Sequence, residues 1–404
     1  MESPETTGLK RGIRLESGRR SYAYQNIQNI MGVSETMNDR LDTPSVIIDT
    51  DIMERNIRSM ADSAKRLGIA LRPHAKTHKM PWVAQKQLDA GAVGITVAKV
   101  SEAEVMAEHG INNIFIAYPL VTPAKIARAV RLSGQVELIV GVDSLDGVKL
   151  LSQAAAEAGR ELQVRLEIDT GLRRTGVPYD QAEALASAIH AMEGLRLTGI
   201  YTFRGALLGG KPTLDLQAAG EEEGRLMAGL ADRIRAQGVP IADVSVGSTP
   251  TGLQAAVAKG VTEIRPGTYV FQDRMQARLG VCSLGDCAGS VRVTVVSRPA
   301  ADLAVIDGGS KTFATDVQPN TDPMQLKGFG HVVGLEDAVL ERMSEEHGML
   351  RLGPAAQASG LKAGDVLHII PNHICSTVNL HDKVYFKKGD NYEERAVLAR
   401  GKLQ

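Results

Sequence analysis

The stretch that decides the fold is Leu71-Arg72-Pro73-His74-Ala75-Lys76-Thr77-His78-Lys79. An apolar run over residues 67–71 leads into it, and a helical pattern over residues 80–88 follows it. Lys76 therefore lies where a predicted strand ends and a predicted helix begins. In parallel α/β folds ligands bind at that edge, and a partly desolvated lysine there becomes a nucleophile toward carbonyl groups. Taken alone, the stretch also fits a solvated loop lysine.

The pattern around this stretch repeats along the chain. Strict alternation of eight short apolar strands with helices predicts an α/β fold, a (β/α)8 TIM-type barrel. An open doubly wound sheet is the alternative, but it usually has a Gly-rich turn after its first strand, where this chain has His74-Ala75-Lys76. The expected strands are residues 69–73, 94–97, 113–118, 136–142, 162–169, 195–202, 243–247 and 262–266. Helical patterns between them include residues 101–108, 123–132, 145–158, 179–192 and 214–237.

The chain divides into three regions that differ in composition and in hydrophobic pattern. Residues 1–41 are polar and Arg-rich, and we interpret them as an N-terminal arm. Residues 42–280 contain the expected barrel, preceded by a strand at 43–49, which we expect to pack with the second domain, and a helix at 51–67. Residues 281–404 are expected to form a mainly β domain, because turn residues separate short strands at 290–299, 303–306, 365–370 and 383–386.

Composition argues against several classes of protein. The 404 residues are 43% hydrophobic, enough for two domains with cores. The 46 Lys and Arg residues balance 47 Asp and Glu residues, so no global charge suggests binding to nucleic acid or membrane. No apolar run approaches the roughly 18 residues of a membrane helix, and the N-terminus lacks the apolar segment of a signal peptide. Three cysteines, Cys282, Cys287 and Cys375, make no disulfide framework, so we expect a cytoplasmic protein.

Two adjacent strand ends suit a phosphate group. The seventh strand ends in Gly247-Ser248-Thr249-Pro250, which offers backbone amides and hydroxyls where a helix begins. The eighth ends in Arg265-Pro266-Gly267-Thr268-Tyr269, beside the same place. Ordinary helix capping explains the first segment when it is taken alone. Because the barrel closes, this cradle neighbours Lys76, and pyridoxal phosphate, a phosphorylated aldehyde that a lysine can bind, meets both demands.

Two further strand ends carry weaker signals. The fifth strand is followed by Arg173 and Arg174, one of which could bond the cofactor's phenolic oxygen. Solvated arginines after a capping Asp169 are the simpler interpretation of that segment alone. The sixth strand ends with Tyr201, whose phenol could meet the pyridine ring or could be a core or rim aromatic.

A possible metal site follows a predicted strand at residues 365–370. His373 and Cys375 are two residues apart, so on an extended segment their side chains would point the same way. An imidazole and a thiolate suit Zn²⁺, and two ligands imply an open site rather than a closed structural one. For an isolated His-x-Cys, a buried cysteine and a hydrogen-bonded histidine are the simpler interpretation.

Together these motifs match one family. The chain resembles the D-threonine aldolase and D-serine dehydratase branch of the fold-type III pyridoxal-phosphate enzymes, which have the alanine racemase fold. The resemblance runs from about residue 42 to residue 390. Its motifs, in chain order, are Arg72-Pro73-His74-Ala75-Lys76-Thr77-His78, residues 168–176, Gly247-Ser248-Thr249-Pro250-Thr251, Arg265-Pro266-Gly267-Thr268-Tyr269 and the His373–Cys375 pair.

The resemblance implies a role for each candidate residue. Lys76 is expected to form the Schiff base with the cofactor, Arg174 to contact its phenolic oxygen and Tyr201 to lie near its ring nitrogen. His373 and Cys375 are expected to bind a divalent metal, Zn²⁺ in preference to Mn²⁺ or Mg²⁺, and two chains to form a head-to-tail homodimer. The residues expected around the phosphate are Gly247, Ser248, Thr249, Gly267 and Tyr269.

The activity implied is that of a lyase acting on D-3-hydroxy amino acids such as D-serine, D-threonine or D-3-hydroxyaspartate. Aldolases of this branch tend to carry His-x-Asp and dehydratases His-x-Cys, so Cys375 favours dehydration to a 2-oxo acid and ammonia over cleavage to glycine and an aldehyde. Relatives often have a histidine where this chain reads Tyr201-Thr202-Phe203-Arg204-Gly205. Arg204 could therefore receive a second acidic or hydroxylated group of the substrate.

Two other classes fit less well. An amino acid racemase needs a second acid–base residue from the β domain, for which Tyr385 is a candidate, but the His373–Cys375 pair would then have no purpose. A non-catalytic pyridoxal-phosphate carrier with this barrel normally lacks a second domain, and residues 281–404 argue against it.

Overall fold

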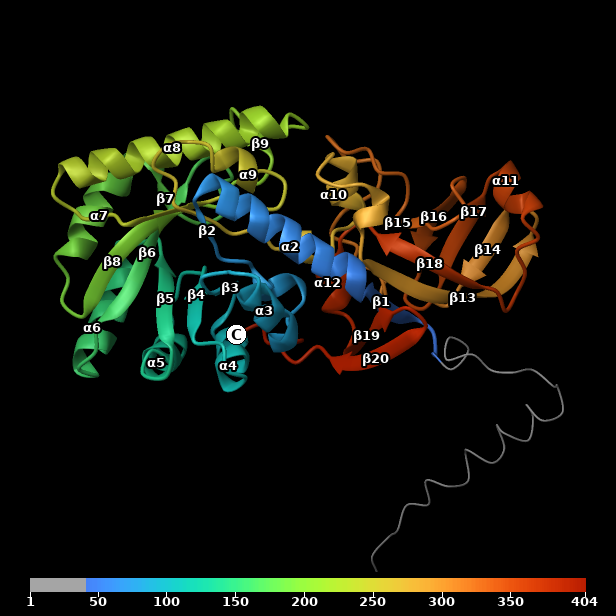
Figure 1. The fold of residues 1–404 in the computed structure, drawn as a ribbon, viewed down its shortest axis with the longest axis horizontal. Coiled ribbons are helices and arrows are strands. Elements are labelled where there is room, and N and C mark those ends of the chain that lie inside the picture. The colour runs from blue at the N-terminus through green and yellow to red at the C-terminus, as the bar shows by residue number, and fades with distance from the viewer. Residues whose placement is uncertain (1–40) are drawn as a thin grey trace, which may run out of the picture. The chain divides into compact units, whose positions relative to one another are not determined.

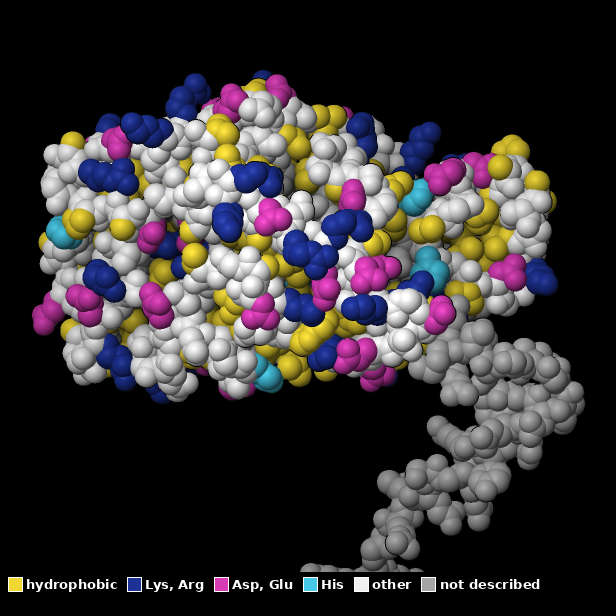
Figure 2. Space-filling view, in the orientation of Figure 1, with side chains coloured by type: hydrophobic (Ala, Val, Ile, Leu, Met, Phe, Trp, Pro, Cys, Tyr) yellow, Lys and Arg dark blue, Asp and Glu magenta, His cyan; other side chains and the backbone are white. Residues whose placement is uncertain are grey.

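A computed structural model of the chain describes residues 41–404. The arm expected at residues 1–41 lies outside the described residues, apart from Leu41. Within residues 41–404 no helix is both long and apolar enough to cross a bilayer. On the face seen in Figure 2, basic and acidic side chains are interspersed and form no large patch of one sign.

The first part of the described chain is a closed barrel of parallel strands covered by helices (Figure 1). The strand order is β2-β12-β11-β8-β6-β5-β4-β3. The ring closes where the backbone of His74 pairs with Thr96, whose N–H donates to Pro73 O at 2.8 Å. All eight predicted strands are present, which confirms the predicted (β/α)8 fold.

The bounds of the elements agree with the expected ranges except at their ends. Strands β2 and β12 are only two residues long, because Pro73 and Pro266 follow them and cannot donate to the ladder. The barrel strands are β2 (Ala70–Leu71), β3 (Ile95–Val97), β4 (Asn113–Ile116), β5 (Glu137–Val142), β6 (Leu162–Asp169), β8 (Leu195–Tyr201), β11 (Asp243–Val246) and β12 (Glu263–Ile264). The helices of this part are α2 (Thr50–Leu67), α3 (Pro81–Asp89), α4 (Val100–Glu108), α5 (Pro123–Leu132), α6 (Leu145–Glu157), α7 (Ala182–His190), α8 (Leu216–Ala236), α9 (Gly252–Ala255) and α10 (Arg274–Arg278), and three further two-residue strands are β7 (Val177–Pro178), β9 (Leu207–Leu208) and β10 (Lys211–Pro212).

The interior of the barrel holds a buried charge network instead of the branched aliphatic layers that usually fill such barrels. Glu263 accepts hydrogen bonds from Arg72 Nε at 2.8 Å and Arg165 Nη1 at 2.6 Å. Arg165 also pairs with Asp243 at 2.9 Å, and Ser245 Oγ donates to Glu263 at 2.5 Å. The buried charges thus compensate one another beneath the barrel mouth.

The second part is a nine-stranded sheet of which six strands close into an antiparallel barrel. Its order is β14-β17-β16-β15-β18-β13-β1-β19-β20, and β13 also pairs with β14. Strand β1 (Ser45–Asp49) lies between β13, to which it is antiparallel, and β19, to which it is parallel. The other strands are β13 (Gly289–Ala300), β14 (Leu303–Ile306), β15 (Gly330–Val332), β16 (Ala338–Met343), β17 (Gly348–Leu352), β18 (Val366–Pro371), β19 (Lys383–Lys388) and β20 (Asn391–Ala396), accompanied by helices α11 (Pro354–Ala358) and α12 (Ile374–Val378).

Helices α2 and α3 join the two parts. Met53 and Ile57 of α2 and Val83 of α3 are buried in the same apolar cluster as Val291 and Ile369 of the β sheet. The predicted fold class, a barrel plus a C-terminal β domain, is therefore confirmed. The expected boundaries at residues 42 and 280 stay a prediction.

Candidate active site

Lys76 lies at the barrel mouth, in a short 3-10 helix (Ala75–Thr77) that follows β2. His74 holds this turn, because its Nδ1 accepts from Lys76 N at 3.3 Å and its N–H donates to Pro266 O at 3.0 Å. The Lys76 Nζ lies 5.3 Å from the ring centre of Phe203. Burial lowers the pKa of Lys76, which increases the share of its neutral, nucleophilic amine.

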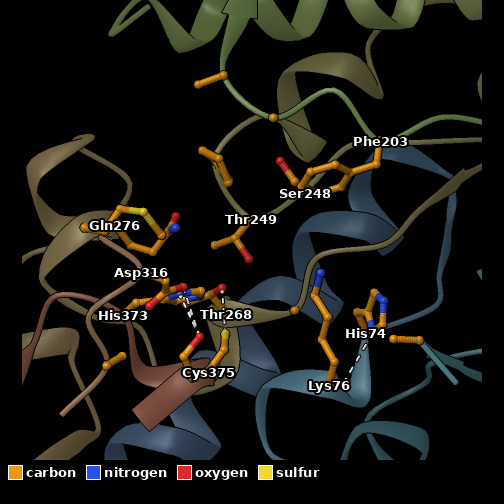
Figure 3. Close-up of a pocket in the computed structure, with 18 of the residues that line it drawn as sticks. His74, Lys76, Phe203, Ser248, Thr249, Thr268, Gln276, Asp316, His373 and Cys375 are labelled. Carbon is orange, nitrogen blue, oxygen red and sulfur yellow. Dashed lines mark hydrogen bonds and ion pairs between the residues drawn. The ribbon is translucent and has the colours of Figure 1, made fainter. Parts of the chain in front are cut away.

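The Lys76 side chain lines a cavity of about 1000 Å³ between the barrel mouth and the β domain (Figure 3). This volume accommodates a cofactor together with a small substrate. The Cys375 Sγ of the β domain donates to Thr77 Oγ1 at 3.1 Å across the cavity edge. Eight of the ten candidate residues line this cavity: Lys76, Arg174, Tyr201, Ser248, Thr249, Gly267, His373 and Cys375.

Ser248, Thr249 and Gly267 form the part of the wall that suits a phosphate. Within residues 41–404 their backbone N–H groups have no hydrogen-bond partner. A Cβ at Gly267 would lie 3.0 Å from Thr77 Oγ1, so any larger residue would leave less room at this wall. Unpaired N–H groups beside hydroxyls are the donors that a phosphate monoester requires, so these residues fit the phosphate of pyridoxal phosphate.

Gly247 and Tyr269 lie behind this wall and do not line the cavity. Gly247 has φ 78° and donates its N–H to the buried Glu223 Oε1 at 2.9 Å. Tyr269 accepts from Gln87 Nε2 at 3.0 Å, and it lines a separate cavity of about 220 Å³. Their expected contact with the phosphate stays a prediction.

Glu167, Tyr201 and Arg265 lie at the barrel end of the cavity. The Tyr201 hydroxyl donates to Glu167 Oε2 at 3.0 Å, and the Arg265 guanidinium lies 5.2 Å from the Tyr201 ring centre. Arg265 is anchored by a 2.6 Å hydrogen bond to Ser245 Oγ, which links it to the buried charge network. Burial raises the pKa of Glu167. This end therefore offers a phenol, a carboxyl group and a buried cation to a bound ring.

Arg174 reaches the cavity from the loop after β6. Its guanidinium lies 4.8 Å from the ring centre of Phe203, the same ring that Lys76 contacts. Arg174 thus lies near Lys76, as its expected contact with the cofactor's phenolic oxygen requires.

The interpretation of residues 373–375 as an extended segment is wrong. Helix α12 begins at Ile374, directly after His373, so Cys375 lies in its first turn. The buried Asp273 accounts for this, because its Oδ2 accepts the Ile374 N–H at 3.0 Å and caps the helix from outside. His373 and Cys375 nevertheless both line the cavity.

The surroundings of His373 suit a metal ligand. Its Nδ1 lies 2.6 Å from Asp316 Oδ2, and Ser376 Oγ donates to the same carboxylate oxygen at 3.0 Å. A carboxylate behind an imidazole orients it and leaves Nε2 for a metal. Residues 41–404 contain no group of three or more His, Cys, Asp or Glu side chains arranged to hold a metal. An imidazole and a thiol are ligand types that borderline-soft Zn²⁺ accepts.

The structure also corrects the expectation for Arg204. Arg204 does not line the cavity, because its buried side chain pairs with Glu222 of α8 at 2.7 Å. Glu222 also accepts from Gly209 N at 3.0 Å, so this ion pair ties the loop after β8 to α8. Arg204 is therefore not available to a substrate.

Sequence reasoning gave no role to four residues of the site: Glu167, Arg265, Asp316 and Gln276. Arg265 lies two residues after Glu263 and two residues before Gly267. On an extended strand this spacing puts the three residues on the same side, which is the signal that could have revealed Arg265. Asp316 and Gln276 lie outside every periodic pattern, and only the fold brings them to His373.

Comparison with known families agrees with this geometry. Residues 48–275 match the alanine racemase N-terminal domain, and the chain belongs to that family. Residues 288–387 match the putative serine dehydratase domain, which is consistent with the branch that the motifs indicated.

Individual relatives cover nearly the whole described chain. D-threo-3-hydroxyaspartate dehydratase of Delftia sp. is 37% identical over 83% of this chain and 92% of its own length. D-threonine aldolase of Arthrobacter sp. is 32% identical over 85% of this chain and 88% of its own. Among solved structures, a mutant of D-threo-3-hydroxyaspartate dehydratase in a metal-free form superposes with a TM-score of 0.82, at 34% identity, over 90% of this chain and 99% of that one.

Proposed function

We propose that this chain is a pyridoxal-phosphate- and metal-dependent lyase that dehydrates D-3-hydroxy amino acids to 2-oxo acids and ammonia. One observation carries the proposal: Lys76, the phosphate-type wall and the His373–Cys375 pair all line one cavity. Two of the similar proteins are named as a dehydratase and an aldolase of such amino acids.

Each expected group has residues that would hold it. Lys76 would bind the aldehyde of pyridoxal phosphate, and Ser248, Thr249 and Gly267 would bind its phosphate. His373 and Cys375 would hold the divalent metal, with Zn²⁺ favoured over Mn²⁺ or Mg²⁺ because the pair is soft. When bound, the cofactor supplies an electron acceptor for the carbon next to it, and the metal supplies a Lewis acid for the substrate's hydroxyl.

Lys76 is the base in this proposal. When the substrate's amino group takes the place of its own, the freed Lys76 amine removes the proton from Cα. Its pKa, lowered by burial, favours the neutral amine that this step needs. Arg174 and Tyr201 hold the ring, and the Phe203 ring packs beside Lys76. His373 and Cys375, as the residues that would hold the metal, would position the β-hydroxyl, which leaves as water when it takes up the proton that Lys76 removed from Cα.

Retro-aldol cleavage is the alternative reaction. It uses the same residues but breaks the Cα–Cβ bond, and the similarity to D-threonine aldolase supports it. The ratio of 2-oxobutanoate to acetaldehyde formed from D-threonine separates the two reactions. If acetaldehyde forms and no oxo acid does, the reaction is aldolase cleavage and not dehydration. Cys375→Asp, which exchanges a soft ligand for a hard one, is expected to raise the share of aldehyde with Mn²⁺ or Mg²⁺.

We further propose a homodimer located in the cytoplasm. The cavity lies between barrel and β domain, and in this family the partner subunit helps to cover the barrel mouth. The three cysteines are free thiols in the structure, which suits a reducing compartment. Sedimentation at working concentration is expected to show a dimer, and a fully active monomer would contradict it.

The decisive test of the function uses the purified protein. It is incubated with D-serine and D-threonine, with and without a chelator, and oxo acid, aldehyde and enantiomers are quantified. We expect oxo acid that disappears on chelation. Interconversion of D and L forms that survives chelation would mean that the protein is a racemase.

A further inference from the structure

Behind the phosphate-type wall lies a buried carboxyl group that the proposed reaction does not use. Glu223 of α8 is fully buried, and its Oε1 accepts the Gly247 N–H at 2.9 Å. Its Oε2 lies 3.2 Å from the Thr251 hydroxyl, which in turn lies 3.2 Å from the Ser248 hydroxyl. Glu223, Thr251 and Ser248 therefore form a chain of hydrogen bonds that ends at the wall of the cavity.

Close packing of α8 against α9 puts this carboxyl group behind the wall (Figure 1). Gly220 and Gly224 lie about one turn apart on α8. A Cβ at Gly224 would collide with Ala255 O of α9, and a Cβ at Gly220 would lie 2.5 Å from Gln254 Cβ. The position of Glu223 thus depends on a close approach of two helices that a side chain at either glycine would prevent.

The surroundings of Glu223 favour its neutral form. The cations that act on it are Arg265, after β12, and Arg204, after β8. Arg265 is bound to Ser245, and Arg204 is ion-paired with Glu222 at 2.7 Å. Neither arginine, nor any other titratable side chain of residues 41–404, is hydrogen-bonded or ion-paired to Glu223. Burial outweighs both arginines and raises the pKa of Glu223, because an ionised carboxylate loses its hydration there.

The protonation state of Glu223 decides the direction of the hydrogen bonds along this chain. An ionised carboxylate only accepts, so Thr251 donates to it, and the bond between Thr251 and Ser248 then forms only with Ser248 as the donor. A protonated carboxyl group donates to Thr251 instead, Thr251 donates to Ser248, and the Ser248 proton is free to face the cavity. Because a phosphate group accepts hydrogen bonds, it needs the second arrangement.

We propose that Glu223 is a positioning residue for the cofactor's phosphate: it is protonated when the phosphate is bound and directs the Ser248 hydroxyl toward that group through Thr251. Phosphate binding is therefore coupled to the uptake of a proton by Glu223. The inference rests on the proposed function, because that function puts the phosphate at Ser248, Thr249 and Gly267. An ionised Glu223 would oppose the phosphate by its charge and by reversing the chain of hydrogen bonds.

Pyridoxine 5′-phosphate tests the coupling, because it has no aldehyde and cannot react with Lys76. Its Kd for the cofactor-free full chain is measured between about pH 5 and pH 9, for the unmodified protein and for Glu223→Gln, whose amide donates to Thr251 at every pH. We expect the ratio of the two Kd values, unmodified over variant, to rise about tenfold or more with pH, since binding one proton changes affinity by about tenfold per unit of pH. Titration of the ligand and of Lys76 affects both proteins and cancels in the ratio.

Proton uptake gives a second measurement, by calorimetry in two buffers that differ in ionisation enthalpy. At the pH where the Kd ratio changes most, the unmodified protein should take up as much as about one proton more per site than Glu223→Gln. Pyridoxine, which lacks the phosphate, should show no such difference. Glu221→Gln is the matched control, because Glu221 is exposed on the same helix. Thr251→Val, which keeps the shape of Thr251 and breaks the chain, should lose the pH dependence that separates the unmodified protein from Glu223→Gln.

Several results would overturn the proposal: a Kd ratio that stays constant with pH, equal proton uptake by the two proteins, the same effect in Glu221→Gln, or an unchanged pH dependence in Thr251→Val. If Glu223→Gln does not fold, the proton counts of the unmodified protein and of Thr251→Val make the same comparison. Failure of the proposed function is distinct from these. If D-serine and D-threonine yield no product, the lyase function is wrong, but the Kd values of pyridoxine 5′-phosphate still decide the role of Glu223.

Discussion

Two lysines near the cavity show how position decides chemistry at the scale of single residues. Lys76 Nζ reaches into the cavity, whereas Lys99 Nζ lies over the Tyr118 ring, 3.7 Å from its centre. Borohydride treatment of the cofactor-loaded protein is expected to fix the cofactor on Lys76, as peptide mapping can establish. Lys76→Ala should remove this label and lower kcat by about 10²–10⁴ or more. Lys99→Ala should keep both the label and the kcat of the unmodified protein. A label on any lysine other than Lys76 would refute the assignment.

Asp316 provides a second prediction at this scale. Because its carboxylate holds the His373 imidazole, Asp316→Asn is expected to weaken Zn²⁺ binding about 10- to 100-fold while cofactor binding is retained. Competition with a chromophoric chelator measures the change. Asp322→Asn is the control, since Asp322 is exposed and bonds only to Gln325 among the described residues. Unchanged Zn²⁺ affinity in Asp316→Asn would mean that the Asp316 carboxylate does not support His373 as a ligand.

At the scale of elements, the turn between β11 and α9 contributes Ser248 and Thr249 to the phosphate wall. Ser248→Ala combined with Thr249→Ala is expected to weaken cofactor binding by about 1.5–3 kcal/mol for each hydrogen bond lost to the charged group. Equilibrium dialysis of pyridoxal phosphate measures this loss. Thr262→Ala is the matched control, because the Thr262 hydroxyl accepts from Val244 N at 2.9 Å and Thr262 does not line the cavity. If the double variant binds the cofactor as tightly as the unmodified protein, the phosphate lies elsewhere.

The barrel could be predicted from the sequence because its strands and helices are local and periodic. Parallel strands buried on both faces read as apolar runs, and Gly68 after α2 marks a left-handed helix end. Strand β20 was missed, and so were strands β15 to β17. Their residues pair only within the closed antiparallel barrel and include charges such as Glu341 and Arg342, so no clear alternation marks them.

The site was predictable where its residues follow strands. Lys76, Ser248 and Gly267 come at strand ends, whose common edge follows from barrel topology. Asp316 and Gln276 could not be predicted, since Asp316 lies in a loop and Gln276 in the five-residue helix α10, and neither segment has a period in the sequence. Arg204 was misjudged because a residue that follows a strand by a few positions can turn outward, here toward Glu222.

At the scale of the whole molecule, the charge network inside the barrel makes stability depend on pH. Burial alone would raise the pKa of Glu263, but Arg165 and Arg72 lower it from 4.5 to about 2. A depressed carboxyl pKa stabilises the fold above pH 4.5, and this contribution is lost as pH falls from 4.5 toward 2.

Glu263→Gln tests this network. It is expected to destabilise the protein by about 3–5 kcal/mol near neutral pH, because it leaves buried arginines uncompensated. Denaturant unfolding should show that the difference from the unmodified protein shrinks between pH 4.5 and pH 2. Glu341→Gln, which breaks an exposed pair with Arg351, should cost about 0–1 kcal/mol. A difference that stays constant with pH would show that Glu263 does not carry the effect.

The position of β1 governs the order in which the molecule can be completed during synthesis. This strand is translated before the whole barrel, yet its neighbours are β13 and β19, at residues 289–300 and 383–388. At typical elongation rates β1 waits on the order of tens of seconds for β13 to leave the ribosome. Until then it is an unpaired apolar edge, Ser45-Val46-Ile47-Ile48-Asp49, of the kind that chaperones bind and that aggregates form on. The nascent chain therefore needs its C-terminal domain before β1 can pair with both of its neighbours, β13 and β19.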